Sequence, residues 1–566
     1  MKGQHTWPGS SALAGLLILL LAGFFAVRNV SSWPARIYYP GEESYEGAAL
    51  AEITRLAQGV PIYNPPSEAG FAGATYGPLY FITSSHLIDP AQPSYRPLRL
   101  LSALAILGCA CGCALLAFWL TRSYWAVSLS PLIFFSYGIV TYHGISALSD
   151  NVALFLFFAG FLIAYKFRHS SGILLCVPFI AAGFYYKQQF VAGPVAVLSY
   201  LLLEKRYFRA AQFAGALAAT ILVLFGYFQW VVFRGQEFWR HFLFYQSTLF
   251  SWHDFRNGAL VFLLIFAAPL ALGLDFLRTH PDRLITCYVI SAVALGLATI
   301  GKESAFIQYF YESILMISVL GAAFVAARLA ERRPAFDATV LLGFAFVTGQ
   351  FYIPSPPTPA DLADHQAVQM LLRNRFPPGS RALGFRGGDL VQAGLDTPFA
   401  DLFQTELLAR RGIVSNQALV SRIRQAWFSV IVLDFDLDTE HDPFYLNFYL
   451  TEPTRQAIAQ NYRLESTLKV PAPEWLREKR CFYVYVPQLP AAGFESHQTK
   501  RDSNLSHQIA QRGGQKSPQK VTNLAPLLSP FSGTTLVGHN QPEINVLRRR
   551  PASRELVLYM LYKWPG

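Results

Sequence analysis

The sequence predicts a mainly α-helical protein that crosses a membrane many times and carries a small α/β domain. Hydrophobic residues make up 53% of the 566 residues and charged residues only 14%, and the mean hydropathy is +0.30. The apolar residues gather between Leu13 and Tyr352 in stretches of about 17 to 25, the length a helix needs to span a bilayer. This composition excludes a disordered chain and does not suit an ordinary soluble enzyme.

About eleven transmembrane helices are expected. The first runs from about Ser11 to Val27, and because no small-x-small cleavage site follows it, a retained helix is favoured over a signal peptide. The other predicted spans begin near Leu100, Trp125, Asn151, Gly172, Phe190, Ala210, Gly258, Leu284, Ser313 and Thr339.

The basic residues of the short loops predict which side each loop faces. With the N-terminus inside, the inner loops carry Arg122, Lys166, Arg168, Lys205, Arg206, Arg209, Arg278, Arg283, Arg328, Arg332 and Arg333. The outer loops carry only Lys187, Arg234, Arg240, Arg256 and Lys302. This asymmetry follows the positive-inside rule and places residues 28–99, the first loop, and everything after about Ser355 outside. We therefore expect a multi-pass protein of the inner membrane with its functional site on the periplasmic side.

The net charge of +11 does not indicate a nucleic-acid partner. The last 76 residues hold ten Lys and Arg against four Asp and Glu, which accounts for six of the eleven charges. The rest of the surplus lies in short loops between apolar spans, where it reflects membrane topology. Five of the six cysteines fall in apolar spans, so neither a disulfide framework nor a zinc site is implied.

Three regions follow from the change in composition along the chain. Residues 1–355 form the predicted transmembrane domain. Residues 356–490 have the composition of a soluble α/β domain, with strand-like runs at 428–436 and 481–486 and helical stretches around 401–411 and 453–460. Residues 491–566 are rich in Ser, Gln, Asn, Gly and Pro without sustained periodicity, so we expect an unstructured tail.

The first loop contains an acidic pair, Glu42 and Glu43, directly after the Pro40-Gly41 turn. Apolar residues then recur at helical spacing from Leu50 to Ala57, which predicts a helix lying along the membrane surface. At the start of a helix the dipole favours an ionised carboxylate, the form that a general base requires. The alternative is that both glutamates are solvated loop residues.

The order of motifs in this loop resembles the GT-C superfamily of polytopic glycosyltransferases, in particular bacterial members related to the protein mannosyltransferase and aminoarabinose transferase families. In those families an acidic residue or pair follows the first helix, as Glu42-Glu43 does here, and the stretches 59–63 and 77–80 continue the pattern. The families more often have Asp at the first acidic position, so which glutamate is the base stays open. Further similarity lies at 149–151, 186–189, 301–303 and 308–312, so the resemblance covers about residues 10–355.

The resemblance implies a donor-binding site built from several of these motifs. A polyprenyl-phosphate sugar keeps its phosphate at the membrane interface, where Lys302 and Lys187 are placed by the predicted topology. Asp150, Tyr76 and Tyr309 are expected to contact substrate. The alternative for each lysine is that its side chain extends to the lipid headgroups without binding the donor.

The implied reaction is transfer of a sugar from a polyprenyl-phosphate-linked donor to an acceptor hydroxyl, with inversion, at the outer face of the membrane. Glu43, or Glu42, would deprotonate the acceptor, and polyprenyl phosphate would leave as a stabilised anion. Membrane lipids and a glycan, lipid or protein acceptor are the expected partners. A lipid or polysaccharide flippase without glycosyl transfer is the alternative, and a non-catalytic membrane scaffold is a third reading.

No cofactor and no protein-bound metal are expected. The residues His86, His143 and His253 fall in predicted outer loops and offer a divalent-metal alternative together with Glu42 or Asp150, but their spacing supports no ligand set. Asp434, Asp436 and Asp438 form an Asp-x-Asp pattern after a predicted strand, which is more typical of a solvated strand-end turn than of a nucleotide-sugar site.

Overall fold

The computed structural model describes residues 8–42, 46–246, 249–302, 305, 307–331, 356–437, 449–470 and 480–488. Several predictions fall outside these residues: the span beginning near Thr339, the acidic residue Glu43, Asp438 of the Asp-x-Asp pattern, and the tail.

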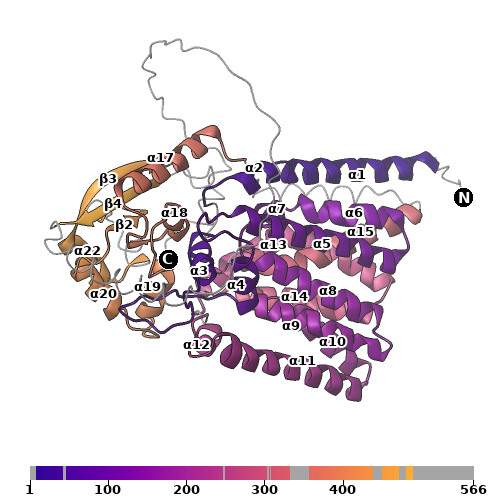
Figure 1. The fold of residues 1–566 in the computed structure, drawn as a ribbon. Coiled ribbons are helices and arrows are strands. Elements are labelled where there is room, and N and C mark those ends of the chain that lie inside the picture. The colour runs from indigo at the N-terminus through magenta and orange to yellow at the C-terminus, as the bar shows by residue number, and fades with distance from the viewer. Residues whose placement is uncertain are drawn as a thin grey trace, which may run out of the picture. The chain divides into compact units, whose positions relative to one another are not determined.

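Ten long or medium-length helices lie at the first ten predicted spans and run side by side (Figure 1). They are α1 (Pro8–Val30), α5 (Arg96–Thr121), α6 (Tyr124–Ser136), α8 (Asp150–Lys166), α9 (Val177–Tyr186), α10 (Ala192–Leu203), α11 (Tyr207–Tyr227), α13 (Trp252–Thr279), α14 (Arg283–Ile300) and α15 (Tyr311–Ala330). Within the described residues, six helical segments are long and apolar enough to cross a membrane, and three shorter apolar helices accompany them. The protein is thus a mainly α-helical, multi-pass membrane protein, and the count of eleven spans stays a prediction.

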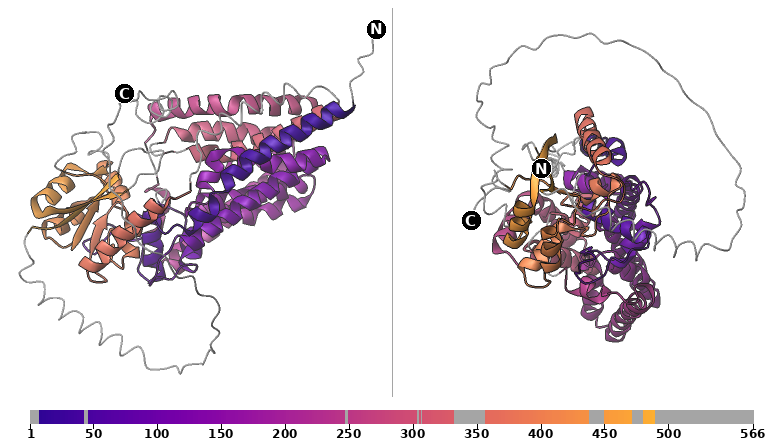
Figure 2. Two further views of the ribbon diagram at one scale, coloured as in Figure 1. Left: turned by 90° about the horizontal axis from the view of Figure 1, so that it is seen from above. Right: turned by 60° about the vertical axis from the view of Figure 1, so that its left-hand side comes forward.

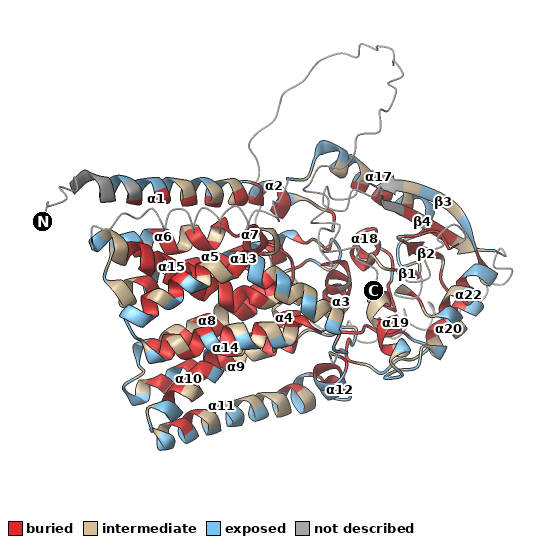
Figure 3. Cartoon of the chain, turned by 180° about the vertical axis from the view of Figure 1, so that it is seen from behind, coloured by how far each residue is buried: buried red, intermediate tan, exposed pale blue. Residues whose placement is uncertain are grey.

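The helix α15 is the centre of the helical part. All of its residues from Tyr311 to Ala326 are buried, and it packs against α5, α6, α13 and α14 (Figure 3). The helix α11 is different because apolar residues such as Leu222 and Val223 are about 70% exposed, at 69% and 71%. A helix that is apolar on all sides is buried in protein when it is central and faces lipid when it is peripheral. The helix α15 is the central, buried case, and α11 is the peripheral case.

Short helices connect the long ones at the end of the bundle that bears the candidate site. They are α2 (Trp33–Tyr38), α3 (Glu46–Ala57), α4 (Pro78–Ser85), α7 (Gly138–His143) and α12 (Phe238–Leu243). The remaining turns are the 3-10 segments η1 (Ser171–Cys176) and η3 (Ile307–Phe310) and the π-helical segment η2 (Phe228–Val232).

The predicted helix after the acidic pair is present as α3, and its apolar residues are covered by protein; its setting along the membrane surface stays a prediction. Leu50 and Ile53 are fully buried, and so are most other residues of α3. The physical reason is that α3 is covered by α4 on one side and by α18 (Gly387–Gln392) of the α/β part on another. Its apolar face therefore packs on protein.

The residues after 355 contain a four-stranded sheet with helices on both faces (Figure 2). Its strands are β1 (Ala382–Gly384), β2 (Val430–Leu433), β3 (Tyr462–Val470) and β4 (Arg480–Pro487), in the order β1-β2-β4-β3. The pair β1 and β2 is parallel, whereas β4 is antiparallel to both β2 and β3. The helices besides α18 are α17 (Pro359–Arg375), α19 (Leu402–Arg410), α20 (Gln417–Arg424) and α22 (Glu452–Asn461).

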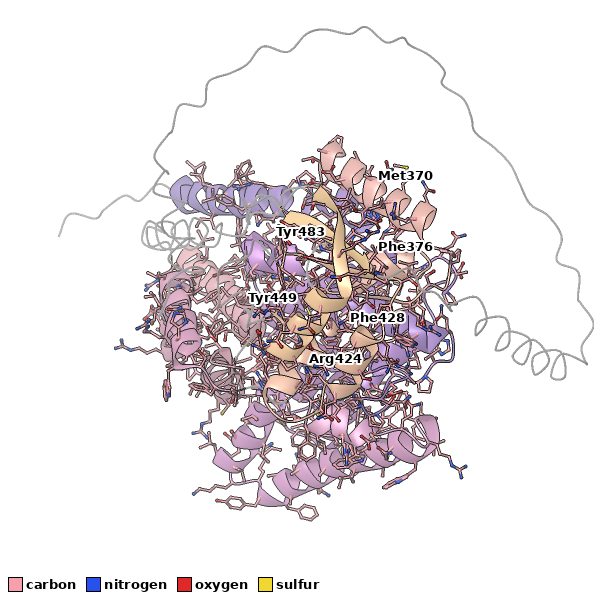
Figure 4. The ribbon with its side chains drawn as sticks, turned by 90° about the vertical axis from the view of Figure 1, so that its left-hand side faces the viewer. Met370, Phe376, Arg424, Phe428, Tyr449 and Tyr483 are labelled. Carbon is pink, nitrogen blue, oxygen red and sulfur yellow. The ribbon has the colours of Figure 1, made fainter. Side chains whose placement is uncertain are left out.

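Both predicted strands and both predicted helices of this domain are confirmed, since they correspond to β2, β4, α19 and α22. All four residues of β2 are buried, because alternate side chains enter two cores. Val430 and Val432 pack in the core that includes Leu372 of α17, while Ile431 and Leu433 pack in the core under α19, α20 and α22. Figure 4 views this domain with residues of both cores labelled, among them Phe376 and Phe428.

Candidate active site

The backbone that leads to the acidic pair is held by one buried ion pair. Arg99 of α5 and Glu46 of α3 are both fully buried, and Arg99 Nη2 lies 2.5 Å from Glu46 Oε2. The same guanidinium donates hydrogen bonds to the carbonyl oxygens of Arg36, Tyr39 and Gly41 at 2.6–2.8 Å. The planar guanidinium has five N–H donors, so it can bind several oxygens at once. Arg99 therefore fixes the chain immediately before the acidic pair.

The residue Glu42 is half-buried, and its carboxylate oxygen Oε2 is buried without a hydrogen-bond partner. Desolvation raises its pKa to about 7, opposed first by the positive charge of Arg386 and assisted by the negative charge of Asp389. A hydrogen bond from the backbone N–H of Gly47 also lowers the pKa. A desolvated carboxylate poised near neutral pH is typical of a general base.

Lys187 and Asp150 form a second charged group at the ends of two helices. Asp150 begins α8 and Lys187 follows the last residue of α9, so each side chain projects from the same end of the bundle. Lys187 Nζ lies 2.7 Å from Asp150 Oδ1 and 5.4 Å from the centre of the Tyr76 ring. The structure thus brings together three predicted site residues from separate loops.

Lys302 joins this group through its charge. It lies between α14 and η3, where it forms a β-bridge with Phe250. Partial desolvation and then the positive charge of Lys187 lower its pKa. Much of the Lys302 residue is nevertheless exposed, and in the described part of the chain it forms no ion pair. Two lysines near enough for their charges to interact, one of them unpaired, are an arrangement that attracts a phosphate.

Tyr76 lies where these groups converge. Its ring meets that of Tyr80 edge-on at 5.3 Å, and its pKa is raised by burial, by the charges of Asp150 and Glu52, and by Tyr309. Tyr309 belongs to η3, one turn before α15. Lys187 therefore contacts both Asp150 and Tyr76, and the Asp150 charge also acts on Tyr309.

Glu42 belongs to an adjacent group, since the charges acting on it most strongly are those of Arg386 and Asp389. Glu46 links the two groups, because its Oε1 accepts from the backbone N–H of Ala147, three residues before Asp150.

The buried carboxylate Glu52 escaped the sequence interpretation. It is 2% exposed, its Oε1 has no hydrogen-bond partner, and burial together with the charge of Asp401 raises its pKa well above the ordinary value. The apolar spacing from Leu50 to Ala57 placed Glu52 off the apolar stripe, which predicts exposure. It is buried because α3 is covered on more than one side.

A shallow hollow of about 450 Å³ lies at the start of α13, lined by Trp252, His253, Phe255 and Arg256. It adjoins Lys302, because Ser251 donates its backbone N–H to the Gly301 carbonyl at 2.6 Å and Phe250 bridges to Lys302.

Three of the weaker candidates, Asp434, Asp436 and His143, form hydrogen bonds within the protein. Asp434 accepts from Arg386 at 3.3 Å, and Asp436 accepts from the Tyr485 hydroxyl at 3.0 Å. His143 accepts a hydrogen bond at its backbone carbonyl from Asn151. Over the described ranges, no three His, Cys, Asp or Glu side chains are grouped in a way that would hold a metal ion.

The helical bundle and the α/β domain together have the fold of the GT-C glycosyltransferases, as the resemblance in the first loop implied. The crystal structure of ArnT from Cupriavidus metallidurans bound to undecaprenyl phosphate superposes with a TM-score of 0.52. The match covers 85% of this chain and 98% of that chain at 12% sequence identity.

Two further solved structures are similar at lower scores. The apo state of the same ArnT covers 84% of this chain and 97% of its own, at 10% identity and a TM-score of 0.49. The Archaeoglobus fulgidus oligosaccharyltransferase, in complex with Zn and sulfate, covers 84% of this chain and 74% of its own, at 11% identity and 0.46. No protein-family description matches the sequence, and no curated protein matches it by sequence.

Proposed function

We propose that the protein is a glycosyltransferase that transfers a sugar from a polyprenyl-phosphate-linked donor to an acceptor hydroxyl, with inversion, at the outer face of the inner membrane. The observation that carries this proposal is the contact of Lys187 with Asp150 and Tyr76 at one end of the helices, with Lys302 near enough for the Lys187 charge to act on it. Two cations beside an aromatic ring and a carboxylate suit an anionic phosphate joined to a polar sugar.

The donor phosphate is proposed to lie between Lys302 and Lys187. Lys302 contributes the larger share because Asp150 already neutralises part of the charge of Lys187. Both cations would stabilise the charge that develops on the leaving phosphate. An ArnT of the same fold was crystallised with undecaprenyl phosphate, and we extend that class of lipid phosphate to this chain as part of the proposal.

The acceptor hydroxyl is proposed to lose its proton to the acidic loop. Glu42 supports this role by its unpartnered buried oxygen and its pKa of about 7, and Glu43 is the alternative that lies outside the described residues. The deprotonated oxygen attacks the anomeric carbon as the bond to the phosphate breaks, and the phosphate leaves with that electron pair. A single displacement inverts the anomeric centre. Asp150, Tyr76 and Tyr309 would contact the sugar.

The test supplies polyprenyl-phosphate sugars to the protein in nanodiscs and follows release of polyprenyl phosphate together with donor binding. The variants Glu42→Gln and Glu43→Gln keep size and polarity but remove proton acceptance, so one of them should lower turnover by about 10²- to 10⁴-fold with little change in donor affinity. Full turnover in both single variants and in the double variant would show that this loop is not catalytic. Movement of lipid between leaflets without cleavage of a glycosidic bond would establish the flippase alternative.

A further inference from the structure

The acidic loop lies directly against the α/β domain. The side-chain amide of Gln392 in α18 donates to the Pro40 carbonyl at 2.9 Å. A Cβ on Gly47 would lie 2.2 Å from Glu42 Oε2 and 3.1 Å from the backbone nitrogen of Gly388. A Cβ on Gly388 would in turn lie 3.0 Å from the Cα of Gly47, so the two backbones approach closely and the loop and α18 form one packed seam.

Arg386 stands at the start of this seam and is held from several directions. Its Nε lies 3.3 Å from Asp434 Oδ1, its Nη1 lies 3.8 Å from Asp389 Oδ2, and its Cζ lies 4.6 Å from the centre of the Phe482 ring. The side chain is 13% exposed. Its position is therefore set by both β2 and β4 of the sheet as well as by α18.

Apart from Arg386, the charged groups that act on Glu42 are negative. Asp389 comes from α18 and Asp434 follows β2, and both raise the pKa of Glu42. From α17, His365 Nδ1 lies 3.3 Å from Asp389 Oδ1, so that imidazole is directed to Asp389. Tyr95, which precedes α5, also lies close to the Glu42 charge. Arg386 supplies the principal positive charge that allows Glu42 to ionise in this buried seam.

We infer that Arg386 is a positioning residue: it anchors the start of α18 to the sheet, and α18 holds the acidic loop with Glu42 in place. This assigns the domain a part in the reaction that is separate from any contact with acceptor. The inference rests on the proposed function only in that the loop is taken to carry the base.

The kinetic test compares Arg386→Gln with a matched control. Arg422→Gln removes another contact between the same two parts of the chain, because Arg422 Nε donates to the Glu68 carbonyl at 2.9 Å, but it changes no charge beside Glu42. Arg386→Gln should lower kcat at pH 7 by about tenfold or more and leave the donor KM within about twofold. Arg422→Gln should match the native protein, and Arg386→Lys should recover most of the loss.

The pH profile separates positioning from simple damage. Loss of the Arg386 charge makes Glu42 harder to ionise, so the acidic limb of kcat should move to higher pH in Arg386→Gln. Asp434→Asn removes a negative charge and should move the limb to lower pH. Profiles that coincide with the native one in both variants would overturn the inference.

A stability measurement tests the coupling between Arg386 and Glu42 without any assay of turnover. Thermal unfolding in detergent at pH 8 is compared for Glu42→Gln, Arg386→Gln and the double variant. The loss of the Asp389 and Asp434 contacts is the same in both backgrounds, but the loss of the Arg386 charge costs more when Glu42 is ionised, so the two changes should be non-additive. Additive effects would refute the inference. Strong coupling combined with full turnover in the amide variants of the acidic loop would retain the coupling and refute the proposed function.

Discussion

The burial of Glu42 predicts that this residue destabilises the protein at the pH where it serves catalysis. Burial raises its pKa from the ordinary 4.5 to about 7. Since one pKa unit corresponds to about 1.4 kcal/mol, the ionised carboxylate costs up to about 3 kcal/mol of folding free energy. A carboxyl group with a raised pKa favours folding below its unfolded pKa, and that advantage is lost as the pH rises through 7.

Glu42→Gln removes the titration and should therefore stabilise the protein at pH 8 but not at pH 5. Thermal unfolding in detergent across this range measures the effect. Asp89→Asn is the matched control, because Asp89 is an exposed carboxylate in the same first loop and should leave the pH dependence unchanged.

Turnover of the native protein should rise with pH, whereas its stability should fall. If Glu42 is the base, about 10% of it is ionised at pH 6 and about 90% at pH 8, so native turnover should rise about tenfold between them. Glu42→Gln should be nearly inactive at both values while remaining the more stable protein at pH 8. A variant with unchanged stability at pH 8, or native stability that does not fall as the pH rises from 5 to 8, would refute the assignment of a desolvated carboxylate with a raised pKa.

The other predictions concern topology, donor binding and the support of the loop. Ser415→Cys, in the α/β domain, should react with an impermeant thiol reagent added from outside, whereas Ser170→Cys should not; the reverse pattern would contradict the orientation drawn from the loop charges. Lys302→Ala should weaken donor binding and kcat/KM together by about 10- to 100-fold, the loss expected for a charged hydrogen bond, and unchanged donor affinity would exclude phosphate capture. Arg99→Ala should lower stability by about 3–5 kcal/mol because it leaves Glu46 charged and buried, while Arg96→Ala on the same helix removes only an exposed contact with Tyr38 and should have little effect.

The helices of the bundle could be predicted because hydrophobicity is a local property of the chain. A stretch such as residues 96–121 is apolar enough to form a membrane helix whatever it packs against. The β2 and β4 strands were also predictable from their apolar runs. The short strand β1 was missed, because three residues carry too little periodicity to be recognised without their partner β2.

The candidate site was only partly predictable. Motif order indicated Lys187, Asp150, Tyr76 and Lys302 separately. The contact of Lys187 with Asp150 and Tyr76 depends on where α4 and α8 begin relative to the end of α9. The burial of Glu52 could not be inferred, since it requires a second element covering α3.

By itself the sequence determined the membrane-spanning character of the chain, the places of the first ten helices and the resemblance to the GT-C superfamily, because these depend on the composition and order of neighbouring residues. Only the tertiary structure decided that α3 packs on α18 and that the Arg386 charge acts on Glu42, more than 300 residues away in the chain. Burial and charge at a site are set by residues that folding brings together. No pattern within the first loop encodes the desolvation and the Arg386 charge that together set the pKa of Glu42.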